Sequence, residues 1–153
     1  HGLAIGNGMA YGARLSSKNW HTYVVLGDGE LNGGPVWESA MATAHFKLSN
    51  LTALVDRNQL CIDGPTEEVM ALEPLRDKWE AFGWKALDID GHDFDQICEA
   101  IDVARAEKSR PTMIIAKTVK GKGVDFMENV AGWHYAGLDE AMKEKALDCL
   151  QKG

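Results

Sequence analysis

Short, predominantly apolar runs constrain this chain more than any other feature of its sequence. They cover residues 23–26, 51–55, 86–89 and 113–116, and each is followed by a glycine or a polar residue. Runs this short and this apolar are typical of strands that are buried on both faces, as in a parallel sheet.

Segments with helical periodicity lie between these runs, at about residues 3–15, 36–48, 74–82, 94–104 and 139–150. Pro74 suits the first turn of the third segment, and Gly83 is expected to end it. Strands that alternate with helices predict βαβ units. We therefore expect an α/β fold, doubly wound, with a mostly parallel sheet and helices on both faces. The 153 residues fit a single domain.

Composition excludes several classes of function. The formal net charge of −7 argues against nucleic acid or an anionic membrane as the main partner. No apolar run approaches the roughly 18 residues of a membrane span, and no signal peptide is recognisable. The three cysteines are far apart and indicate a reducing compartment, which favours a cytoplasmic location. The chain opens with His1 rather than Met, so we expect its upstream part to be missing.

Polar, glycine-containing loops follow the four expected strands, over residues 27–32, 56–60, 90–93 and 118–123. In an open parallel sheet, ligands bind at the carboxyl ends of the strands. Loops that carry carboxylates and amides at one such edge suit a hard cation together with a phosphate group.

Asp28 is the first candidate ligand, because it lies between two glycines just beyond a buried strand. Its carboxylate, the amide oxygen of Asn58 and one backbone carbonyl just beyond Asn58 could form half of an octahedron around Mg²⁺. Phosphate oxygens and water would complete the octahedron. The alternative is that Asp28 belongs to a simple turn and that Asn58 caps a loop.

The spacing of these residues resembles a known signature. Asn58 lies 30 positions after Asp28, with one helix and one strand expected between them. This resembles the Gly-Asp-Gly…Asn signature of thiamine-diphosphate enzymes, and the wider sequence resembles transketolase. The similarity extends over essentially the whole chain, through residues 1–3, 8–10, 27–34, 36–40, 56–60, 62–64, 90–93, 117–123 and 133–134.

The resemblance implies that residues 1–153 form one diphosphate-binding domain of the thiamine-diphosphate-binding fold, without its upstream part. It also implies thiamine diphosphate as cofactor and Mg as metal, with Ca or Mn as possible substitutes. The implied metal ligands are Asp28, Asn58 and the carbonyl of Leu60. The implied cofactor-binding residues are Gly27, Asp28, Gly29, Asn58, Leu60 and His134, and His134 is also the implied catalytic residue.

The activity implied by the resemblance is transfer of a two-carbon ketol unit between sugar phosphates, as in the pentose phosphate pathway. The pyrimidine-binding domain with its catalytic Glu is absent from this sequence. Activity is therefore expected only with a C-terminal transketolase subunit or domain, in a dimer or an α2β2 heterotetramer. The alternatives are an enzyme of the deoxyxylulose-phosphate synthase or dihydroxyacetone synthase type, or a non-catalytic structural partner. Gly33 stands where many long transketolases carry Glu.

Several other polar residues have two interpretations. His92 lies in the segment 90–93, which is interpreted as a turn and an N-cap for the helix that begins at Phe94 rather than as part of a ligand site. Lys120 and Lys122 either neutralise a substrate phosphate or only solvate their loop. Glu38 either stabilises a helix N-terminus or reaches across a dimer contact. Trp133 is interpreted as a lid aromatic, with a satellite core as the alternative.

Overall fold

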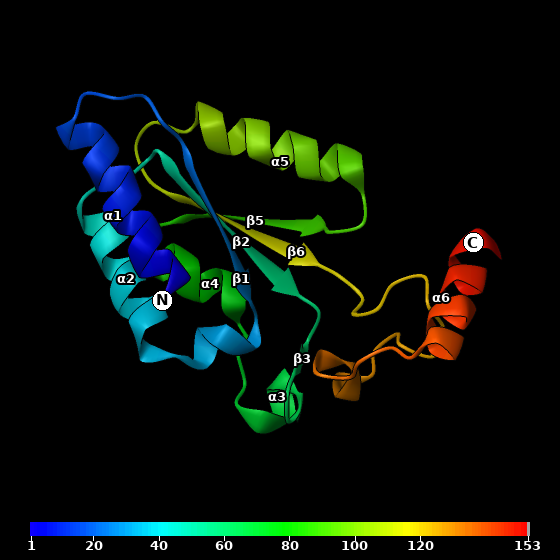
Figure 1. Cartoon of the computed structure of the whole chain (residues 1–153). Coiled ribbons are helices and arrows are strands. Elements are labelled where there is room, and N and C mark those ends of the chain that lie inside the picture. Colours follow the sequence, from blue (N-terminus) through cyan, green and yellow to red (C-terminus); the bar gives the residue numbers. More distant parts are fainter. Residues whose placement is uncertain (153) are drawn as a thin grey trace.

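A parallel sheet of four strands forms the centre of the computed structural model, which describes residues 1–152 (Figure 1). Each of the four apolar runs lies in one of these strands, as predicted. Across the sheet the order is β1 (Thr22–Gly27), β2 (Leu51–Arg57), β6 (Thr112–Lys117) and β5 (Lys85–Asp90). All neighbours are parallel, so their carboxyl ends meet at one edge.

The predicted helices are all present. The longer ones are α1 (Gly2–Leu15), α2 (Gly34–His45), α4 (Leu75–Ala81), α5 (Phe94–Ala106) and α6 (Glu140–Lys152). The prediction for the second helix was wrong at its end, because α2 stops at His45 rather than continuing to Leu48. Lys47 has a φ of 50°, and this left-handed conformation turns the chain towards β2.

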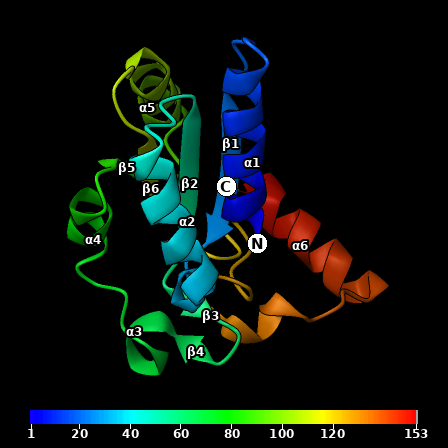
Figure 2. The same cartoon turned by 90° about the vertical axis from the view of Figure 1, so that its left-hand side faces the viewer.

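Helices cover both faces of the sheet, so the doubly wound prediction is confirmed (Figures 1 and 2). On one face α1, α2 and α4 pack over the sheet around a core that includes the buried Trp79 and Trp84. On the other face, a smaller core of Ile89, Ala100 and Ile114 lies under α5. This second layer stops short of β1, where Tyr23 and Val25 are 44% and 73% exposed. The prediction that this strand is buried on both faces was therefore wrong, because β1 lies at the edge of the sheet and α5 does not cover it.

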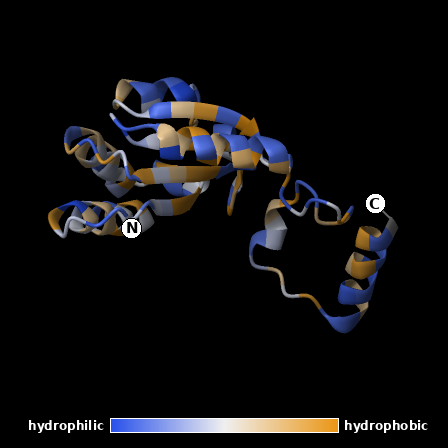
Figure 3. Ribbon diagram, turned by 90° about the horizontal axis from the view of Figure 1, so that it is seen from above, coloured by the Kyte–Doolittle hydropathy of each residue, from blue (hydrophilic) through white to orange (hydrophobic). Residues whose placement is uncertain are grey.

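Short elements that the sequence did not predict surround the carboxyl edge of the sheet. They are η1 (Gly29–Asn32), the hairpin of β3 (Leu60–Cys61) and β4 (Gly64–Pro65), α3 (Thr66–Val69) and η2 (Ala131–His134). Figure 3 shows α6 and the segment before it set apart from the sheet. Within residues 1–152, no helix has both the length and the apolar character needed to cross a membrane.

Candidate functional site

A pocket of about 800 Å³ lies at the carboxyl ends of β1 and β2. It brings together side chains and backbone from the loop after β1, the loop after β2, and the distant segment that contains η2. All six site residues predicted from the sequence line it, namely Gly27, Asp28, Gly29, Asn58, Leu60 and His134.

The register of the sheet explains why the two loops meet. Gly27 is paired with Asp56, so the loops that follow β1 and β2 leave the sheet at the same height. Gly29 allows the loops to approach closely, because a Cβ atom there would lie 2.8 Å from Cβ of Cys61. A Cβ on Gly27 would have no atom within 4 Å, so the side of Gly27 towards which a side chain would project is open, and its backbone N–H donates to Oε2 of Glu30 at 3.2 Å.

Asp28 is buried, with 1% of its surface exposed, and both of its carboxylate oxygens are held. Oδ1 accepts a hydrogen bond of 2.8 Å from the backbone N–H of Gly29, which makes Asp28 the N-cap of η1. Oδ2 accepts hydrogen bonds from the N–H of Gln59, at 2.6 Å, and from Nη1 of Arg57, at 3.1 Å. The carboxylate is therefore fixed in orientation before any ligand binds.

Asn58 is oriented by Asp56, a residue that sequence reasoning did not single out. Nδ2 of Asn58 donates to Oδ2 of Asp56 at 3.0 Å, and this assigns the other amide atom, Oδ1, as the acceptor. Oδ1 accepts from the N–H of Leu60 at 3.0 Å, which leaves one lone pair for a further ligand. Asp56 is itself held by a hydrogen bond that Oγ1 of Thr118 donates from the end of β6.

Arg57 is the second residue that sequence reasoning missed. It is only 3% exposed, and its guanidinium contacts carboxylates of Asp28, Glu67 and Glu73 at 3.1, 2.9 and 2.9 Å. Burial opposes the charged form, but hydrogen bonds to Glu73 and Asp28 outweigh this and raise the pKa of Arg57. An arginine at the end of a buried strand, with two glutamates beyond it, is the signal that could have revealed this cluster.

The segment between β6 and α6 supplies the opposite wall of the pocket. His134 lies at the end of η2, and Lys120 also lines the pocket, whereas Lys122 does not. Trp133 turns away, because its Nε1 donates to the carbonyl of Phe126 at 2.9 Å and its ring packs on the Phe126 ring. These contacts place Trp133 in the packing of its own segment, as in the satellite-core alternative.

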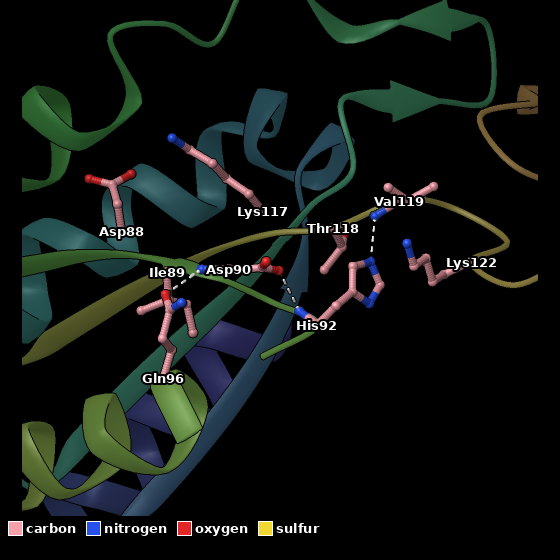
Figure 4. Close-up of a pocket in the computed structure, with 9 residues that line it drawn as sticks. All are labelled: Asp88, Ile89, Asp90, His92, Gln96, Lys117, Thr118, Val119 and Lys122. Carbon is pink, nitrogen blue, oxygen red and sulfur yellow. Dashed lines mark hydrogen bonds between the residues drawn. The ribbon is translucent and has the colours of Figure 1, made fainter. Parts of the chain in front are cut away.

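A second pocket, of about 540 Å³, lies at the carboxyl ends of β5 and β6 and contains none of the predicted site residues (Figure 4). In this pocket Nε2 of His92 accepts from the N–H of Val119 at 2.8 Å. Asp93 caps α5 by accepting from the N–H groups of Asp95 and Gln96, at 2.9 and 3.1 Å. The predicted turn and N-cap are therefore confirmed, and His92 holds the start of the segment that leads to Lys120.

The donor set of the first pocket suits a hard cation. Among residues 1–152 there is no group of three or more His, Cys, Asp or Glu side chains that could hold a metal. The first pocket offers instead one carboxylate from Asp28, one amide oxygen from Asn58 and the backbone at Leu60. Such mixed oxygen ligands, with places left for phosphate and water, are what Mg²⁺ prefers. The pocket therefore fits a metal–diphosphate group.

Comparison with known proteins agrees with this chemistry. The family described as "Transketolase, thiamine diphosphate binding domain" matches residues 11–148. The chain belongs to the transketolase family. It corresponds to the N-terminal, thiamine-diphosphate-binding domain or subunit of that family.

Individual relatives show how far the similarity extends. It is 45% identical, over 96% of its length, to one subunit of the apulose-4-phosphate transketolase of Phocaeicola vulgatus, and covers 52% of that protein. It is 40% identical to a 6-deoxy-6-sulfo-D-fructose transketolase subunit of a Clostridium species, covering 99% of this chain and 55% of the relative. The crystal structure of Campylobacter jejuni transketolase superposes with a TM-score of 0.91 at 29% identity, over 98% of this chain and 24% of that one. The chain thus spans about half the length of the subunits that it resembles.

Proposed function

We propose that this chain binds the diphosphate of thiamine diphosphate through Mg²⁺, or through Ca²⁺ or Mn²⁺ in its place, and serves a ketol-transferring enzyme. The observation that carries the proposal is the convergence of Asp28, Asn58, Leu60 and His134 on one pocket. Relatives named for apulose-4-phosphate and for 6-deoxy-6-sulfo-D-fructose support a sugar-phosphate or related sugar as substrate.

In this proposal Asp28, Asn58 and the carbonyl of Leu60 hold the metal. Gly27 has no side chain and open space where one would project, which lets the diphosphate approach the chain closely. Lys120 and His134 face the same pocket and can neutralise or donate to its anionic oxygens. When bound, thiamine diphosphate supplies the carbanion chemistry that ketol transfer needs, and the protein supplies binding and orientation.

A partner is part of the proposal, because the resemblance to transketolases implies that the Glu that ionises the cofactor belongs to a pyrimidine-binding domain other than the diphosphate-binding domain formed by these residues. Relatives that are themselves named as transketolase subunits support a separate C-terminal subunit, in a dimer or an α2β2 assembly. The chain alone is therefore expected to lack ketol transfer. Activity of a monodisperse preparation of this chain alone would contradict this part of the proposal.

The metal assignment is tested by Asp28→Asn, with Asp95→Asn on α5 as the control. Calorimetry would measure the affinity for thiamine diphosphate in the presence of Mg²⁺. Loss of a metal ligand should weaken affinity by at least ~100-fold, since even groups behind the ligands change it by 10–100-fold. Equal affinities of the two variants would show that Asp28 is not a ligand.

The catalytic assignment is tested by His134→Ala in the assembled enzyme, with the exposed His45→Ala as the control. A donor that acts on charge developing in the transition state should affect turnover by about 10²–10³-fold. Cofactor affinity should change much less. Near-normal turnover of the His134 variant would shift the role to Lys120.

A further inference from the structure

Arg57 lies directly behind Asp28 and is bound from several directions. Its Nη1 donates to Oδ2 of Asp28 and, at 2.7 Å, to Oγ1 of Thr66. Its Nη2 donates to Glu67 and Glu73, both at 2.9 Å, and its Nε donates to Glu73 at 3.3 Å. A planar guanidinium held at all three nitrogens has little freedom to rotate.

The contacts divide the two oxygens of Asp28 into different roles. Oδ2 is occupied by Arg57 and by the N–H of Gln59. Among the described residues, Oδ1 accepts only from the adjacent N–H of Gly29. Because a carboxylate oxygen has two lone pairs, Oδ1 is the atom that keeps one for a cation.

We propose that Arg57 is the positioning residue of the metal ligand Asp28: it holds Oδ2 and thereby presents Oδ1 to the pocket. The glutamates hold Arg57 in turn. Glu67 is anchored by the N–H of Leu72 at 3.0 Å, and Glu73 by the N–H of Leu75 at 2.8 Å. This inference rests on the proposed function, since it concerns the metal of the same site.

Charge alone would give Arg57 the opposite effect on metal binding. A guanidinium beside a carboxylate weakens the attraction of that carboxylate for a cation, so its removal would tighten cation binding. Asp28, Glu67 and Glu73 outnumber the single guanidinium, so the cluster stays favourable to a divalent cation while Arg57 is present. Positioning and charge thus predict affinity changes of opposite sign.

The experiment compares Arg57→Met and Arg57→Lys with Arg76→Met. Arg76 is an exposed arginine that also contacts two carboxylates, those of Glu80 and Asp88, away from the pocket, and so controls for loss of an ion pair. The probe is Mn²⁺ with saturating thiamine diphosphate, and electron paramagnetic resonance reports free Mn²⁺. Circular dichroism shows which variants fold and sets a temperature at which those variants remain folded.

We expect Arg57→Met to weaken Mn²⁺ affinity tenfold or more, Arg57→Lys to weaken it threefold or more, and Arg76→Met to leave it unchanged. Unchanged or tighter binding by Arg57→Met overturns the inference, since a purely structural role lowers only thermal stability. If Arg57→Met does not fold, Arg57→Lys decides, and wild-type affinity of that variant overturns the inference. Asp28→Asn separates the two proposals: if it binds Mn²⁺ as well as the wild type, the proposed function itself fails.

Discussion

Two glycines in α1 offer a matched test of how closely this helix packs on the sheet. A Cβ atom at Gly6 would overlap Cγ2 of Val24 in β1, whereas a Cβ at Gly8 would meet nothing within 4 Å. Both residues lie inside the same helix, so Gly6→Ala and Gly8→Ala make the same chemical change in different surroundings. The comparison isolates the packing of α1 on β1.

The structure sets the expected magnitudes. Alanine is better than glycine inside a helix by about 1 kcal/mol, so Gly8→Ala should raise the free energy of unfolding by about that amount. Gly6→Ala has the same helical gain, but overpacking a core site costs about 1–3 kcal/mol. The buried Val24 cannot easily turn away, because a β-branched side chain is restricted at χ1. Gly6→Ala should therefore be about 1–3 kcal/mol less stable than Gly8→Ala.

Urea denaturation followed by fluorescence of the buried Trp79 and Trp84 would measure both variants under one set of conditions. The difference between the variants is the quantity of interest, since it cancels the shared change in helix propensity. Equal stability of the two variants would refute the reasoning and place α1 farther from β1 than the structure has it.

Three further predictions follow from individual contacts. Hydrogen bonds from Oγ and the N–H of Ser109 lower the pKa of Glu107 to about 2, so Ser109→Ala should raise that pKa towards its ordinary value, as NMR titration would show. In stability terms, Glu107 stabilises the fold above pH 4.5, and this contribution is lost as the pH falls towards 2. Burial, and then the positive charges of Lys108 and Arg105, lower the pKa of His21, so the stability of the fold should decrease as the pH drops below 6.5. In His21→Gln the denaturation midpoint should therefore change less between pH 7 and pH 5 than it does in the wild type. Trp84 is fully buried and donates to the carbonyl of Ala40 at 3.0 Å, so Trp84→Ala should lower the free energy of unfolding by about 3–5 kcal/mol, whereas a loss below 1 kcal/mol would contradict its place in the core.

The sheet was predictable because its information is local. Residues such as Ala53, Leu54 and Ile114 lie in the short apolar runs of the two central strands, and burial on both faces produces such runs without help from distant residues. The cap at Asp93 was predictable for the same reason, since the side chain bonds to the N–H groups two and three positions along the chain.

The surroundings of the site were not predictable in the same way. Arg57 depends on Glu67 and Glu73, which lie 10 and 16 residues away and reach it only because α3 and the chain before α4 fold back over the end of β2. The strands β3 and β4 have two residues each, which is too short for a periodic pattern that could predict them from the sequence. The assignment of His134 came from the resemblance to transketolases and stays a prediction about catalysis, although His134 does line the pocket.

The outer edge of β1 affects how the protein should behave in concentrated solution. The N–H of Thr22 bonds to the carbonyl of Asn50 beside β2, so the backbone groups of Tyr23 and Val25 point away from β2 at the outer edge of the sheet. Residues 22–27 contain no charge and no proline, the two devices that usually discourage strand addition at such an edge. Wherever this edge is left uncovered, concentrated samples should self-associate through it. Val25→Lys, at a position whose side chain already faces solvent, should suppress that association without disturbing the pocket at the carboxyl end of β1, which Val25 does not line.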